Sequence, residues 1–141
     1  MKKHTIISIL VVISIFLVIG VFSSKLIPAY GEFYKEIKNV SLSLKGETEL
    51  ITAKNINSWV EKNINYEYHY FPIGIRATWE ERRGDCTDKS ILKKIMLSYA
   101  GIESRLAHGY VFEDKHDTIY FRINGTYQNF ENFDFVGWGR W

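Results

Sequence analysis

Hydrophobic and polar positions are distributed unevenly along this chain, because one apolar run near the N-terminus lacks a polar face. Residues 5–24, TIISILVVISIFLVIGVFSS, carry no charged side chain. A helix of that length rises about 30 Å, which matches the hydrocarbon core of a bilayer. The run is longer than the apolar core of a typical signal peptide, and no small-x-small cleavage site follows it. We therefore predict that residues 1–24 form one N-terminal transmembrane helix, with a signal peptide as the alternative.

The charges that flank this run bear on its orientation. Lys2 and Lys3 lie on the short N-terminal side, so the positive-inside rule directs the N-terminus to the cytoplasm and the following domain to the extracytoplasmic side. Lys25, Lys35 and Lys38 lie on the other flank and weaken this assignment. The chain is thus expected to be a single-pass membrane protein with an exported domain.

The remaining residues, about 115 of them, suffice for one folded domain. Residues 25–45 contain Pro28, Gly31 and a Ser-rich patch without a sustained hydrophobic period, so we interpret them as a stalk or a first packing segment. Residues 46–141 are expected to form the folded domain.

Two helices are predicted in that domain from apolar positions that recur every three or four residues. The first lies between Glu47 and Asn63, and the second runs from Thr87 to Ala100 before Gly101, which suits a helix C-terminus. Asp85 or Thr87 can supply the capping oxygen at the start of the second helix.

An alternating pattern takes over after Gly101 and predicts three strands, over residues 105–112, 118–123 and 126–130. Asn124-Gly125 between the last two is a signal for a two-residue hairpin. Tyr66, Tyr68 and Tyr70 also alternate with polar residues, which suits a short extended segment. The predicted class is α+β, with helices packed on an antiparallel sheet.

Composition restricts the function classes further. The chain is 46% hydrophobic and 24% charged, which is ordinary for a globular protein. Its net charge of +2 comes from Lys2 and Lys3, so nothing indicates a nucleic-acid-binding surface. Cys86 is the single cysteine, which excludes an intrachain disulfide and a cysteine-rich zinc site. Cys86 is therefore a buried packing residue, a reactive thiol or part of an intermolecular disulfide.

Cys86 lies at the start of the second predicted helix, where unpaired N–H groups and the helix dipole stabilise a thiolate. A nucleophilic thiol also needs a base, and His69, His108 and His116 are the histidines of the predicted domain. A third group usually orients the imidazole. Asp134, an acid among aromatic residues, is a candidate for that role.

These residues resemble a known family. The segment Gly84-Asp85-Cys86-Thr87-Asp88-Lys89-Ser90, followed by Gly101-Ile102-Glu103-Ser104-Arg105 and Gly109-Tyr110, is similar to the core of the transglutaminase-like superfamily of papain-type cysteine enzymes. The resemblance covers roughly residues 56–135. It implies a papain-like transglutaminase core with Cys86 as the nucleophile, His116 as the base and Asp134 as the orienting acid. Asp117 and Thr118 depart from it, since a small residue and an aromatic usually follow the histidine.

The resemblance implies a cysteine enzyme that acts on peptide or carboxamide bonds of a protein or peptide substrate through an acyl-enzyme. With the apolar run of residues 5–24, the chain is expected to be a membrane-anchored enzyme of this kind. The N–H group of Cys86 is a natural oxyanion donor, and Trp79, Tyr70 and His108 are further substrate or oxyanion candidates. We expect hydrolysis rather than transamidation, and no metal or organic cofactor. The alternative is a catalytically inactive module of the same fold, tethered to the membrane for binding or scaffolding.

Overall fold

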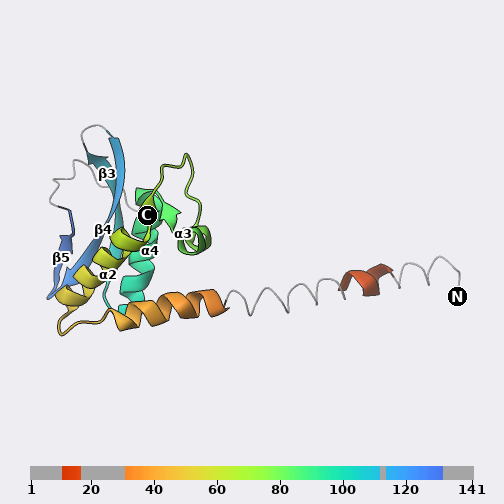
Figure 1. Ribbon diagram of the computed structural model, residues 1–141, viewed down its shortest axis with the longest axis horizontal. Coiled ribbons are helices and arrows are strands. Elements are labelled where there is room, and N and C mark those ends of the chain that lie inside the picture. The colour runs from red at the N-terminus through yellow and green to blue at the C-terminus, as the bar shows by residue number, and fades with distance from the viewer. Residues whose placement is uncertain (1–10, 17–30, 112–113, 132–141) are drawn as a thin grey trace, which may run out of the picture. The chain divides into compact units, whose positions relative to one another are not determined.

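The computed structural model describes residues 11–16, 31–111 and 114–131 (Figure 1). The chain divides into two units, Met1–Glu36 and Ile37–Trp141. Residues 11–16 of the first unit are helical. Among the described residues, no helix combines the length and the apolar character needed to cross a bilayer. Most of the predicted transmembrane run, residues 5–24, lies outside the described residues, so the membrane anchor stays a prediction.

Helical residues 37–43 open the second unit, in the segment interpreted as a stalk or a first packing segment. Ile37 and Ser41 are fully buried, one helical turn apart. The Ser41 hydroxyl donates to the carbonyl of Ile37 over 2.7 Å. This part of the segment therefore contributes buried side chains.

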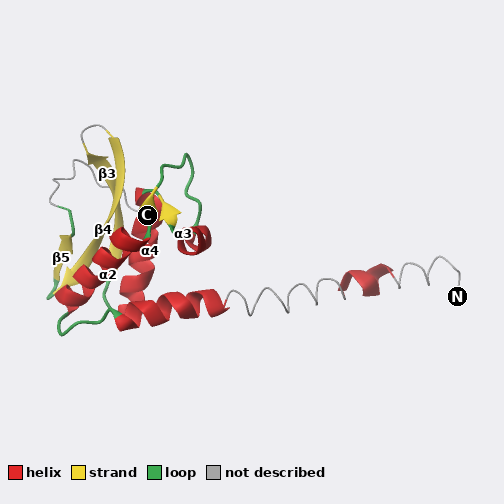
Figure 2. Cartoon of the chain, in the orientation of Figure 1, coloured by secondary structure: helices red, strands yellow, loops and turns green. Residues whose placement is uncertain are grey.

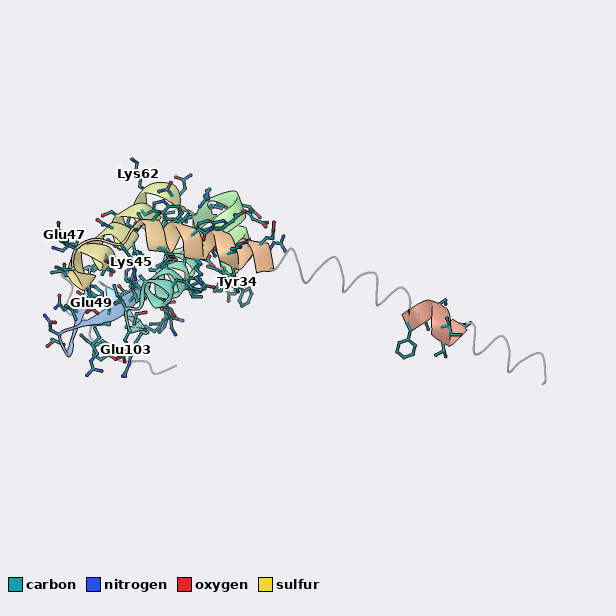
Figure 3. The ribbon with its side chains drawn as sticks, turned by 90° about the horizontal axis from the view of Figure 1, so that it is seen from below. Tyr34, Lys45, Glu47, Glu49, Lys62 and Glu103 are labelled. Atoms are coloured by element: carbon teal, nitrogen blue, oxygen red, sulfur yellow. The ribbon has the colours of Figure 1, made fainter. Side chains whose placement is uncertain are left out.

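Helix α2 (Glu49–Asn63) confirms the first predicted helix of the domain. The Thr48 side chain caps its start by accepting from the amide of Ile51, 3.2 Å away. Glu49 in the first turn and Lys62 in the last turn complement the helix dipole, and Figure 3 shows them toward opposite ends of α2. Its buried face includes Ala53, Ile56 and Val60, in agreement with the helical spacing of the sequence.

Helix α4 (Cys86–Ala100) confirms the second predicted helix, extended by one residue at its start. Asp85 is its N-cap, and Gly101 ends it in the left-handed conformation with φ of 88°. Glycine adopts that conformation without the steric cost that a Cβ would impose. Leu92, Met96 and Leu97 of α4 are completely buried.

The predicted meander is also confirmed. Strands β3 (Ser104–Val111), β4 (Asp114–Ile123) and β5 (Thr126–Asn129) form an antiparallel sheet in the order β3-β4-β5. Asn124 and Gly125 both have positive φ, 49° and 82°, as the two-residue turn between β4 and β5 requires.

Two short elements escaped sequence analysis, and a third, at Asn65–Tyr66, opens the segment predicted to be a short strand or extended. Helix α3 (Ile75–Glu81) spans seven residues, too few to give a periodic pattern. Strands β1 (Asn65–Tyr66) and β2 (Arg83–Gly84) pair in parallel, which places the chain after α2 beside the chain before α4. The tyrosine alternation extends beyond β1, and Tyr68 and Tyr70 are exposed residues of the loop that follows.

The helices pack on one side of the antiparallel sheet (Figures 1 and 2). Helix α4 contacts β3 and β4, and α2 packs against α4. Ile119 and Phe121 of β4 are buried toward α4, and Phe121 stacks on Phe130 with ring centroids 4.3 Å apart. The second unit is therefore an α+β fold, as predicted.

Candidate active site

The turn from β2 into α4 carries Cys86, and it is built around a close approach at Gly84. A Cβ atom at Gly84 would lie 2.7 Å from the Cβ of Asp88 and 3.3 Å from Cγ2 of Thr78. The first distance is shorter than side chains tolerate, so this position favours glycine. The Gly-x-Cys spacing thus has a steric reason in this fold.

Two aspartates hold the first turn of α4 through a capping box. The amide of Asp88 donates to Asp85 Oδ1 over 3.0 Å, and the amide of Asp85 donates to Asp88 Oδ2 over 3.3 Å. The same carboxylate of Asp88 accepts from the amides of Ile73 and Gly74, at 3.4 Å and 3.2 Å. Asp88 is only 1% exposed, so a buried acid ties the turn of Cys86 to the loop before α3.

Cys86 is the first residue of α4 and is partly exposed. A thiol at this point meets the positive end of the helix dipole and the unpaired amides of the first turn. This partial exposure distinguishes Cys86 from an inert, fully buried cysteine.

The beginning of β4 lies against that first turn. The hydroxyl of Thr87 donates to Asp117 Oδ2 over 2.5 Å, and the hydroxyl of Ser90 donates to the main-chain carbonyl of Asp117 over 3.0 Å. Cys86 precedes Thr87 and His116 precedes Asp117, and consecutive Cα atoms are about 3.8 Å apart. The fold therefore brings the backbone segments that carry Cys86 and His116 side by side.

Strand register separates the two histidines of this region. His108 pairs with Asp117, and Gly109 pairs with His116. Because side chains alternate along a strand, His108 and Asp117 lie on the face toward α4, whereas His116 starts from the opposite face near the beginning of β4. The residue that pairs with His116 is a glycine.

His116 contacts a carboxylate that sequence analysis missed. Its Nε2 atom lies 3.0 Å from Oε2 of Glu131, and both side chains are about a quarter exposed, 29% and 26%. The hairpin register provides a signal for this contact. Continuing the pairing of Tyr120 with Asn129 by two residues places Glu131 opposite Thr118, on the same face as His116. Asp134 lies outside the described residues, so its role stays a prediction.

The other candidate residues occupy different environments. His108 contacts Asp117 through Nδ1, while His69 lies 3.8 Å from the carboxylate of Glu67. Tyr70 is 83% exposed, and Trp79 is 4% exposed. The Trp79 ring stacks on the ring of Trp59, with centroids 5.3 Å apart, so Trp79 is a packing residue.

A cluster of charged side chains lies at the contact between α2 and α4, the helix that begins at Cys86. Glu61 of α2 contacts the Nζ atoms of Lys89 and Lys93 at 2.5 Å and 2.7 Å, and both lysine side chains are largely buried. Burial alone would raise the pKa of Glu61, but the hydrogen bonds and charges of the two lysines outweigh it and lower the pKa below its ordinary value. In the part of the chain that the structure describes, no three His, Cys, Asp or Glu side chains converge as a metal site.

Residues 38–139 match the model of the Transglutaminase-like superfamily. A UPF0252 protein of Pyrococcus furiosus is 32% identical over 112 residues, which cover 73% of this chain and 34% of the relative. The chain therefore spans about a third of the length of this curated relative.

Solved structures share the fold at low sequence identity. A structure named as a TGase superimposes with a TM-score of 0.61 and 15% identity, covering 79% of this chain and 33% of the other. A "putative cysteine protease" of Cytophaga hutchinsonii gives a TM-score of 0.57 and 23% identity over 70% of this chain and 37% of its own. A "putative protease" of Parabacteroides distasonis gives a TM-score of 0.58 and 18% identity, covering 72% of this chain and 25% of its own.

Proposed function

Because the chain belongs to the transglutaminase-like superfamily, we propose that it is a cysteine enzyme in which Cys86 attacks a peptide or carboxamide carbonyl of a protein or peptide substrate. The observation that carries this proposal is the pair of hydrogen bonds from Thr87 and Ser90 to Asp117. They place the helix turn of Cys86 against the start of the strand that carries His116, whose side chain leaves the strand on the other face. The partial exposure of Cys86 supports the same role.

In the proposed reaction His116 takes the proton of the Cys86 thiol, and the sulfur adds to the substrate carbonyl. The amide N–H of Cys86, at the helix N-terminus, donates to the oxyanion. The C–N bond then breaks as His116 returns the proton to the leaving amine or ammonia. A water molecule hydrolyses the resulting thioester, which releases the acid and restores the thiol.

We propose Glu131 as the carboxylate that orients His116. Its support is the 3.0 Å separation between Nε2 of His116 and Oε2 of Glu131. Asp134 remains a candidate from the family resemblance. The two assignments make different predictions. If Glu131 orients the imidazole, removal of its carboxylate should disturb that orientation and removal of the Asp134 carboxylate should not; if Asp134 orients it, the reverse should hold.

Hydrolysis is proposed over transamidation. Water competes with an amine for the thioester unless the site excludes it, and Cys86 is partly exposed to solvent. Incubation with casein and dansylcadaverine tests this directly. New amino termini or released ammonia without incorporated dansyl label support hydrolysis, whereas incorporation of the label contradicts it.

Because Cys86 is the single thiol in the chain, its reactivity can be measured without interference. The experiment compares iodoacetamide alkylation of the wild type, His116→Gln and the urea-unfolded wild type across pH, with the modified residue located by mass spectrometry. The expected result is faster alkylation of the folded wild type at pH 6–7 than of either comparison. A folded thiol that reacts no faster than the unfolded one would favour the inactive binding module instead.

We also propose that residues 5–24 anchor the domain to a membrane, with the domain on the extracytoplasmic side. The support is the uncharged run and the lysines before it. Membrane fractionation with N-terminal sequencing tests the anchor, since a mature chain that starts after residue 24 would identify a cleaved signal peptide. Protease protection in sealed vesicles tests the side.

A further inference from the structure

Asp117 occupies a position that the proposed reaction does not use. Its side chain is 17% exposed and contacts two other elements, with Thr87 of α4 donating to Oδ2 and His108 of β3 contacting Oδ1. Its main-chain carbonyl accepts from Ser90, one helical turn after Thr87. We name these four residues, Thr87, Ser90, His108 and Asp117, the Asp117 cluster.

The cluster joins three elements at the end of the sheet where the site lies. Below it, the contact between α4 and β4 is apolar, with Ile119 and Phe121 almost fully buried. Apolar packing holds two elements together but has no directional preference. Hydrogen bonds of 2.5 Å and 3.0 Å fix both direction and distance, so the cluster sets the register of the first α4 turn against β4.

Each linking residue is adjacent to a residue of the proposed reaction. Thr87 follows Cys86, and Asp117 follows His116. A shift of the first turn of α4 relative to β4 would therefore change the distance between the sulfur and the imidazole directly. Proton transfer requires heavy atoms about 2.6–3.2 Å apart, so a small displacement has a large effect on rate.

We propose that Asp117 is a positioning residue, which uses Thr87 and His108 to hold the nucleophile turn at a working distance from His116. This inference rests on the proposed function and assigns a role to the position at which the chain departs from the family resemblance. His108 contacts the carboxylate of Asp117 through Nδ1, which gives a role to a histidine that the proposed reaction does not use.

The test measures the His116-dependent enhancement, defined as the iodoacetamide rate of a protein divided by the rate of the same protein with His116→Gln. Thr87→Val removes the hydroxyl while keeping the branched shape, and Thr87→Ser keeps the hydroxyl. Tyr127→Phe is the matched control, because it removes a 2.5 Å hydrogen bond to Glu103 elsewhere on the same sheet. Urea unfolding of every variant measures its stability.

We expect Thr87→Val to lower the enhancement about tenfold across the pH profile, in keeping with the effect of small misplacements in active sites. Thr87→Ser should stay within about twofold of the wild type, and Tyr127→Phe should leave the enhancement unchanged. Asp117→Asn keeps the size of the side chain but loses its charge, and it should also lower the enhancement. It serves as the second variant if Thr87→Val does not fold.

Equal enhancement in Thr87→Val, Thr87→Ser and the wild type would overturn the positioning role, even if Thr87→Val were less stable. Unchanged enhancement in Asp117→Asn would do the same. An enhancement near one in the wild type itself would overturn the proposed function and this inference with it, so the two failures are distinguishable.

Discussion

Substitution of Gly84 by alanine tests the close approach on which the turn before Cys86 is built. The added Cβ would lie 2.7 Å from the Cβ of Asp88, a backbone-proximal atom that cannot move away by rotation of the side chain. Overpacking of this kind costs about 1–3 kcal/mol. Moving Asp88 also weakens its bonds to the amides of Ile73, Gly74 and Asp85, so the upper part of that range is expected.

A loss of about 2 kcal/mol lowers the folding equilibrium constant roughly 30-fold and the melting temperature by about 10 °C in a domain of this size. Urea and thermal unfolding measure both quantities. Gly31→Ala is the matched control, because its Cβ would meet no atom within 4 Å. A Gly84→Ala variant with the stability of the control would refute the steric reasoning. An unchanged alkylation rate of Cys86 in this variant would show that the reactivity of the thiol does not depend on the close approach at Gly84.

Three further predictions address the site, the helix contact and the core. Glu131→Gln should reduce the His116-dependent alkylation of Cys86 at least tenfold, whereas Asp134→Asn should reduce it less; the reverse order would return the orienting role to Asp134. Because folding lowers the pKa of Glu61, ionised Glu61 should stabilise the fold fully at pH above its ordinary pKa, and this stabilisation should disappear as pH falls through the pKa of the folded state. The urea midpoints of the wild type and Glu61→Gln should therefore converge on acidification. A constant difference between the midpoints would contradict the assignment. Phe121→Ala should cost about 3–5 kcal/mol in urea unfolding, because it removes a buried ring stacked on Phe130, and a loss below 1 kcal/mol would be inconsistent with that packing.

The part of the site that could be predicted from the sequence depends on local signals. The sequence predicts Cys86 at a helix start because Asp85 or Thr87 can cap the amphipathic run, and the structure has Asp85 as the N-cap. His116 was distinguished from His108 by the family resemblance rather than by a pattern in the residues. The contact of Glu131 with His116 was missed, although the hairpin turn at Asn124 contains the register that implies it.

The sequence by itself determined the elements whose cause is local: helices α2 and α4 with their caps, and the β4–β5 hairpin with its two-residue turn. Periodicity, capping and positive φ are properties of neighbouring residues, so they can be inferred without the fold. Only the tertiary structure decided the β1–β2 pairing, the clearance at Gly84 and the bond from Thr87 to Asp117 across 30 residues. Each depends on the distance between segments far apart in the chain, which packing sets and no local pattern encodes.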